Sequence, residues 1–498
     1  MRPQALVKHF ADVYRPAHPA VDVGRVVRTR SLPAGVVLVL AATLLAGTPA
    51  HASPDRRLPI VFVHGNSGSA AQFETQFQRF ASNGYPRELL FAYEYDTSVP
   101  DNTVAVAELE PFIDDVLART GAGQVLVAAH SRGTTVSHAY LADPAHAAEV
   151  AKYVNLDGRS SDTPPGGVPT LAVWGEWQSP PDPIRGTVGS IGGARNVYNR
   201  QFGHTETASS AKTFGDIYRF WFGRSPATTD VLPEPPGRVE VAGRAVLFPE
   251  NIGYAGAELE VWEVDATTGR RRERRPEATY PIDETGAFGP LWVHGKKSYE
   301  FAVTREDGSV HHFYQRPFTR DDYFLRLNTG RPGAGLEAFT KHDPRHVNLT
   351  FVRAREMWGD QPDSDVLTVD RLRDGTPPLN VLTPSVAPRT SPGGQGGNTG
   401  EVNALFLTDV GARTATGYAD PDQRTDLGKN QLFPFDNLTF LAAADVYVPA
   451  DTPARGTVRL ALTPRGGRTA AVVNVPAWPS DVHRISVTFP DPGQGRCD

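Results

Sequence analysis

The sequence has almost no cysteine, since Cys497 is the one cysteine among 498 residues. This excludes a disulfide framework and any zinc or redox site of the CxxC type, so packing must hold the fold together. The sequence also has no excess of basic over acidic residues. With 50 Lys and Arg against 56 Asp and Glu, the net charge is −6, which argues against a nucleic-acid partner. The 47 glycines follow no three-residue period, which excludes collagen, and 40% hydrophobic with 21% charged residues is typical of a soluble globular chain.

A long apolar run occurs only near the N-terminus. Residues 34–46 are apolar or small, three arginines precede them within residues 25–30, and Ala-His-Ala follows at 50–52. A basic stretch, an apolar run of this length and an A-x-A site are typical of a secretory signal peptide. The run is too short to span about 30 Å of hydrocarbon, which disfavours a membrane anchor. We therefore expect residues 1–52 to be a signal segment, with Val23 a plausible true start, and the product to be secreted.

Between Leu58 and Phe222, short apolar runs alternate with amphipathic stretches. The expected strands are Leu58–His64, Glu88–Tyr95, Gln124–Ala129, Lys152–Leu156, Thr170–Trp174 and Asn196–Phe202. The expected helices are Ala70–Ser82, Thr103–Arg119, Gly133–Ala142 and Glu206–Phe222. Runs such as IVFVH and VLVAA are apolar at consecutive positions, as in strands covered on both faces. The alternation predicts an α/β domain with a doubly wound, mainly parallel sheet over residues 53–232.

The pattern changes after a proline-rich segment. Residues 233–237 read Pro-Glu-Pro-Pro-Gly, which predicts an extended linker. Beyond it, apolar and polar residues alternate, with apolar residues at Ala257/Leu259/Val261, Val458/Leu460/Leu462 and Ile485/Val487/Phe489. Turn signals such as Glu284-Thr-Gly286 separate these runs. Residues 238–495 are therefore predicted to be all-β, in one or two sandwiches or barrels.

The strongest chemical signal is the stretch Ala129-His-Ser131-Arg-Gly133. A buried strand leads into it and a helix follows at once, which is the pattern of a nucleophile elbow. The serine of an elbow lies on a strained turn between small residues, and Ala129 replaces the more usual glycine. A solvated loop serine is the alternative, but the flanking strand and helix disfavour it. Ser131 is thus the candidate nucleophile.

A serine nucleophile needs a histidine base and a carboxylate that fixes the tautomer of the base. In this fold the acid and then the histidine follow the serine along the chain. His204 lies between the last expected strand and the last helix, at the carboxyl edge of the sheet, and is the expected base. Asp157, directly after a strand and beside a glycine, is the favoured acid, while Glu176 and Asp182 after the next strand stay open as alternatives.

An oxyanion also needs two preorganised backbone N–H groups. One is expected from Arg132, the residue after the serine. The other is expected from Asn66, in the His-Gly-Asn sequence that follows the first strand.

These motifs together resemble those of secreted α/β-hydrolase-fold lipases and carboxylesterases. The chain is most similar to two-domain lipases, in which a compact hydrolase domain precedes a β-barrel domain. The resemblance rests on AHSRGT with Ser131, NLDGR with Asp157 and FGHTE with His204, within residues 58–222. It implies a Ser-Asp-His triad, an oxyanion hole from Asn66 and Arg132, ester substrates and a β domain that helps to engage lipid.

The triad alone does not select the acyl group, so a polyester depolymerase or an amidase is the alternative enzyme. A second alternative is a cell-surface or binding protein with an inactive hydrolase domain. The segment 176–195, rich in Pro and Gly, is either a mobile lid or a surface loop. We expect no cofactor, no metal, no nucleic acid and no stable membrane insertion, and no protein partner is predicted.

Overall fold

A six-stranded parallel sheet is the centre of the N-terminal part of the computed structural model. Its strands are β1 (Ile60–Val63), β2 (Leu90–Tyr93), β3 (Val125–His130), β4 (Val150–Leu156), β5 (Thr170–Gly175) and β6 (Arg195–Asn199). They lie in the order β2-β1-β3-β4-β5-β6, and every pair is parallel. Strands β1, β3 and β5 are buried along their whole length, as their unbroken apolar sequences predict. The predicted parallel α/β sheet is confirmed.

The structure describes residues 57–175, 189–199, 202–357, 365–371, 379–382, 403–408, 441–445, 448–451 and 453–489. The predicted signal segment 1–52 and the alternative acids Glu176 and Asp182 lie outside these residues, as does most of the segment 176–195. None of the helices in the described part of the chain combines the length and apolar character that crossing a membrane requires. The described residues from Pro59 onward lie in one compact unit.

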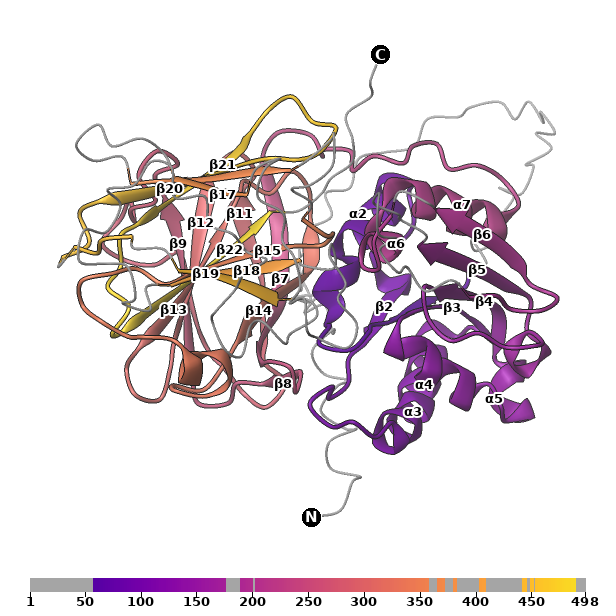
Figure 1. Ribbon diagram of the computed structural model, residues 1–498. Coiled ribbons are helices and arrows are strands. Elements are labelled where there is room, and N and C mark those ends of the chain that lie inside the picture. The colour runs from indigo at the N-terminus through magenta and orange to yellow at the C-terminus, as the bar shows by residue number, and fades with distance from the viewer. Residues whose placement is uncertain are drawn as a thin grey trace, which may run out of the picture. The chain divides into compact units, whose positions relative to one another are not determined.

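Helices cover both faces of the sheet. They are η1 (Ala70–Phe73), α2 (Glu74–Ser82), η2 (Arg87–Leu89), α3 (Thr103–Thr120), α4 (Arg132–Tyr140), α5 (Pro144–Ala148), η3 (Pro165–Gly167), α6 (Glu206–Ser209) and α7 (Ala211–Phe222). Figure 1 shows α3 and α4 on one face and α2, α6 and α7 on the other. On the α2 face, the ring of Phe62 lies 4.8 Å from Phe73 and 5.0 Å from Phe77. On the opposite face, Val61 packs with Ile113 and other aliphatic side chains.

Two of the predicted helices differ from a single α-helix. The one expected over Ala70–Ser82 begins with the 3-10 turn η1, in which Gln72 N–H donates to Ser69 O at 3.1 Å. The one expected over Glu206–Phe222 is divided at Ser210, whose backbone is extended at φ −71° and ψ 152°. The Ser210 hydroxyl accepts the N–H of Thr213 at 3.1 Å, so this residue caps α7 and starts a new helix. The prediction of one helix through Ser210 is therefore wrong.

Apart from the 3-10 turn η4 (Gly335–Phe339), every described element from residue 238 onward is a strand. The strands are β7 (Arg238–Leu247), β8 (Ile252–Gly253), β9 (Glu258–Val264), β10 (Ala278–Pro281), β11 (Ala287–His294), β12 (Ser298–Thr304), β13 (Val310–Gln315), β14 (Asp322–Thr329), β15 (Leu349–Arg353), β16 (Val366–Asp370), β17 (Leu379–Leu382), β18 (Ala404–Thr408), β19 (Leu441–Asp445), β20 (Thr457–Thr463), β21 (Ala471–Pro476) and β22 (His483–Phe489). The largest sheet runs β10-β9-β12-β13-β22-β15-β18-β19, and two four-stranded sheets contain β11-β7-β14 with β8, and β17-β16-β20-β21. The predicted all-β character is confirmed.

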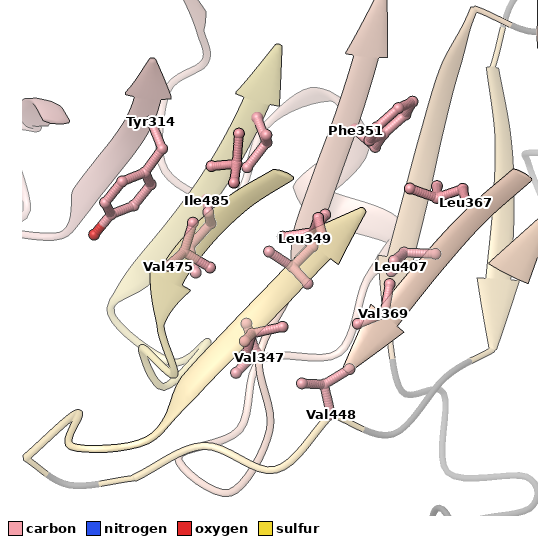
Figure 2. Close-up of a cluster of buried hydrophobic side chains, with 14 of the residues drawn as sticks. Tyr314, Val347, Leu349, Phe351, Leu367, Val369, Leu407, Val448, Val475 and Ile485 are labelled. Atoms are coloured by element: carbon pink, nitrogen blue, oxygen red, sulfur yellow. The ribbon is translucent and has the colours of Figure 1, made fainter. Parts of the chain in front are cut away.

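Among the described residues, two apolar clusters form the core of this C-terminal β region. One gathers side chains from β7, β9, β12 and β14, among them Val241, Phe301 and Leu327. The other, shown in Figure 2, packs Leu349 and Phe351 of β15 with Ile485 of β22 and with residues of the sheet that contains β16. The alternating residues of β9, β20 and β22 are buried, because one face of each strand points into these clusters.

Candidate active site

Ser131 lies on a sharp turn between β3 and α4. Its backbone has φ 52° and ψ −124°, a conformation that is rare for a residue with a side chain. Such strain costs on the order of 1–3 kcal/mol and persists only where the surroundings enforce it. The surroundings here are tight, since a Cβ added to Gly133 would lie 2.4 Å from the carbonyl oxygen of His64, and one on Gly65 would lie 2.8 Å from Ser131 Cβ. Only glycine fits at these two positions. The absence of a side chain there lets the loop that follows β1 come close to the turn that carries Ser131.

Asp157 and His204 are in direct contact at the same edge of the sheet. Asp157 Oδ2 lies 2.7 Å from His204 Nδ1, and the aspartate is fully buried while the histidine side chain is 12% exposed. The second carboxylate oxygen accepts the N–H of Gly175 at 2.9 Å. Because the carboxylate accepts a hydrogen bond from the Nδ1–H group, neutral His204 has Nε2 as its basic nitrogen. This is the tautomer that a general base requires.

Ser131 and Asp157 belong to neighbouring turns. The Ser131 N–H donates to Leu156 O at 3.0 Å, and a Cβ on Gly158 would lie 2.8 Å from Ser131 O. The adjacent side chain, His130, packs its ring 4.5 Å from that of His204 and donates from Nε2 to His204 O at 3.0 Å. The turns that follow β3 and β4 thus meet the residues around His204 that precede α6, here called the His204 loop, at one edge of the sheet. The catalytic roles of these residues stay a prediction.

His130 supports the candidate site through contacts that the sequence did not indicate. Its Nδ1 accepts from the Gln72 amide, while Nε2 supports the main chain of His204. Burial, followed by the proximity of His204, lowers the pKa of His130 well below its usual range. His130 is therefore a neutral imidazole that packs against the ring of His204.

The two predicted oxyanion residues are joined through their side chains. Asn66 follows β1 and is exposed, whereas Arg132 is the first residue of α4. Arg132 Nη1 donates to Asn66 Oδ1 at 3.1 Å, and Nε donates to Asn102 Oδ1 at 2.7 Å. The same guanidinium donates to the carbonyls of Thr97, Val99 and Asp101. The arginine side chain therefore ties the first turn of α4 to two loops, the one that carries Asn66 and the one over residues 97–102. The elbow motif gave no signal for this role.

The loop that carries Asn66 begins at His64, which is a buried and neutral histidine. His64 Nδ1 donates to Gly65 O at 2.9 Å, and Nε2 accepts the N–H of Tyr95 at 3.2 Å. The imidazole stacks on the Tyr95 ring, with centroids 4.5 Å apart. Burial lowers the pKa of His64 to about 4, so the ring is uncharged at neutral pH.

The C-terminal β region contributes side chains to these loops. Asn251, in the turn between β7 and β8, donates from Nδ2 to Gly68 O at 2.9 Å and to Tyr95 O at 3.0 Å. Glu356 accepts the backbone N–H groups of Thr205 and Glu206, directly after His204. Sequence reasoning missed both residues, because each lies at least 150 residues from its partners and no local pattern marks it.

Three family models match the chain. A class 2 lipase model matches residues 57–144, a lipase C-terminal domain model matches residues 237–332, and a further C-terminal domain model matches residues 335–492. The first of these ranges contains Asn66, Ser131 and Arg132.

Several solved structures are similar to parts of the chain. Lipase B of Aspergillus fumigatus is 12% identical and covers 35% of this chain and 55% of its own, with a TM-score of 0.28. A lipase of Bacillus licheniformis in its propeptide form is 11% identical and covers 86% of this chain and 94% of its own, with a TM-score of 0.26. The product of a Listeria innocua gene is 17% identical and covers 35% of this chain and 97% of its own, with a TM-score of 0.28. At these low identities and TM-scores, the structures add no argument to the family matches. Those matches and the parallel α/β sheet support a hydrolase domain of the lipase and esterase type, followed by a lipase C-terminal domain.

Proposed function

We propose that the protein is a secreted serine hydrolase that cleaves carboxylic esters of lipids through an acyl-enzyme. The observation that carries this proposal is the 2.7 Å contact between Asp157 and His204, together with a serine at φ 52° whose N–H donates to Leu156, the residue before Asp157. A buried carboxylate on Nδ1 of a histidine and a strained serine at a strand-to-helix turn are two features of the serine hydrolase sites of this fold. The lipase family matches support ester bonds as the substrate class.

In the proposed reaction, Ser131 Oγ attacks the ester carbonyl while His204 Nε2 takes the hydroxyl proton. Asp157 keeps the imidazole in the right tautomer and stabilises the imidazolium. The backbone N–H groups of Asn66 and Arg132 stabilise the oxyanion, each with an effect of about 3–4 kcal/mol on the transition state. The alcohol leaves with the proton from His204, and water activated by the same imidazole then hydrolyses the acyl-enzyme.

The contacts of Arg132 support its place in the oxyanion hole. Its guanidinium donates to Asn66 and to the loop of residues 97–102, so the first turn of α4 is fixed against the Asn66 loop. Donors held in place before the reaction act more strongly than donors that must reorganise.

The function test is turnover on a tributyrin emulsion, followed by titration of released acid. Ser131→Ala should lower turnover by about 10⁶-fold while the protein stays folded. The matched control is Ser160→Ala, an exposed serine near Asp157, which should leave turnover unchanged. Turnover of the Ser131→Ala variant near the wild-type rate would refute the assignment.

Substrate class and secretion need separate measurements. Rates on tributyrin, a long-chain triglyceride, a polyhydroxyalkanoate film and an amide analogue compare lipase, depolymerase and amidase activities. Faster release from the triglycerides supports the proposal, and faster release from the film or the amide contradicts it. For secretion, the product exported by a host cell should begin at Ser53, after the Ala-His-Ala site.

A further inference from the structure

Glu356 is a buried carboxylate of the β region whose two oxygens both face the His204 loop. It follows β15 and is 0% exposed. One oxygen accepts the N–H of Thr205, and the other accepts the N–H of Glu206 at 3.0 Å. These are the first two peptide groups after His204, so the carboxylate binds the main chain next to the proposed base.

The chain before His204 also rests on this side chain. A Cβ added to Gly203 would lie 2.4 Å from the carboxyl carbon of Glu356. Glycine is therefore needed at residue 203 because Glu356 occupies the space. The main chain on both sides of His204 contacts one carboxyl group.

A buried network of charges keeps Glu356 in place. Arg465 Nη1 donates to the backbone carbonyl of Glu356 at 2.6 Å and to Asp365 at 3.1 Å. Its other terminal nitrogen pairs with Glu206, which also lies 3.6 Å from Arg355. Because Glu206 is the first residue of α6, directly after the His204 loop, this network links that segment to the β region a second time.

We propose that Glu356 is a positioning residue that sets the place of the His204 imidazole from the β region. Asp157 and the His130 ring fix the imidazole and the carbonyl of His204, and Glu356 fixes the two peptide groups that follow. Without Glu356, the loop loses the acceptor for these two N–H groups and can shift relative to Ser131. A displacement of about 1 Å at a reacting group can lower the rate by about 10²-fold.

This inference rests on the proposed function, and its test uses the full chain. In Glu356→Gln the size of the side chain is kept, but an amide NH₂ replaces one of the two acceptors. We expect kcat on a soluble ester to fall by about 10- to 100-fold, with KM changed by less than about twofold. The rate of inactivation by a fluorophosphonate should fall by the same factor, because that reaction depends on the activation of Ser131 and not on lipid binding.

The matched control is Glu300→Gln in the same β region. Glu300 is also fully buried, and its carboxylate pairs with Arg271 and His312. This variant should lose stability but keep wild-type kcat and inactivation rate at a temperature where it is folded. If Glu356→Gln does not fold, Gly203→Ala gives the same comparison, because its methyl group displaces the Glu356 carboxylate and keeps every charge.

The outcomes separate this inference from the function on which it rests. Wild-type protein that does not react with the fluorophosphonate, or reacts without Ser131, contradicts the proposed function. Wild-type protein that reacts through Ser131, together with a folded Glu356→Gln variant that reacts at the same rate, overturns the role of Glu356 alone. An equal loss of kcat in Glu300→Gln would also overturn it, since the effect would then be one of general stability.

Discussion

Replacing Glu94 should destabilise the contact between the hydrolase part and the β region. Glu94 is the residue directly after β2, and its side chain is 4% exposed. The carboxylate pairs with Arg244 at 2.8 Å and with Arg326 at 2.8 Å, and it accepts the N–H of Ala70 at 2.8 Å. Glu94→Gln leaves two buried guanidinium groups facing a neutral amide. Removal of one partner from a buried ion pair costs about 3–5 kcal/mol, so we expect a loss of about that size.

The stabilisation of the fold by Glu94 should depend on pH, and the shift in its pKa gives the direction. Burial alone would raise the pKa of Glu94, but Arg326 and Arg244 outweigh burial and hold that pKa well below its usual range. The unfolded state therefore binds this proton more strongly, and the stabilisation by Glu94 is present above about pH 4.5 and lost as the pH falls. The difference in unfolding free energy between wild type and Glu94→Gln should be full at pH 7 and shrink below about pH 4.5.

Urea unfolding at several pH values, followed by tryptophan fluorescence, measures this difference. The control is Glu88→Gln, an exposed carboxylate of η2, which should change the unfolding free energy by less than about 0.5 kcal/mol. A loss below about 1 kcal/mol at pH 7, or a loss that does not depend on pH, would refute the reasoning.

Three further changes test the site. Asp157→Asn should lower kcat by about 10⁴-fold with little change in the melting temperature, and retention of more than a tenth of the wild-type kcat would contradict the tautomer argument. Gly133→Ala places a Cβ 2.4 Å from the carbonyl oxygen of His64, so urea unfolding should show a loss of about 1–3 kcal/mol, and wild-type stability would contradict the close approach. Burial lowers the pKa of His64 from 6.5 to about 4, so the unfolded state takes up this proton before the folded state does. The unfolding free energy should therefore fall by about 3 kcal/mol as the pH falls from about 6.5 to 4. In urea unfolding against pH, a His64→Gln variant should lack that decline, and an unchanged pH dependence would count against it.

Features that depend on neighbours along the chain were accessible from the sequence. The consecutive apolar residues of β1 and β3 predicted strands covered on both faces, and the structure confirms that sheet. The small residues beside Ser131 predicted a close turn, and Gly133 indeed has no room for a methyl group. Asp157 was favoured because it follows a strand directly, and its carboxylate contacts His204.

Other features were not accessible, either because an apolar pattern continues through a break or because the partners are distant in the sequence. The division of the last predicted helix at Ser210 follows from a hydroxyl that accepts the N–H of Thr213, in a stretch whose apolar periodicity continues through the break. Glu356 and Asn251 bind main-chain groups at least 150 residues away, and single-sequence patterns carry no information at that range. Arg132 was predicted for its backbone alone, because an elbow motif leaves the identity of that side chain open.

The most direct test of the central claim is to identify the residue that a fluorophosphonate modifies. Intact protein is treated with the probe, digested, and the modified peptide is sequenced by mass spectrometry while ester hydrolysis is followed in parallel. The account predicts one adduct per chain, on Ser131, formed as hydrolysis is lost. Complete loss of hydrolysis with the adduct on another residue, or full hydrolysis with Ser131 modified, would contradict it.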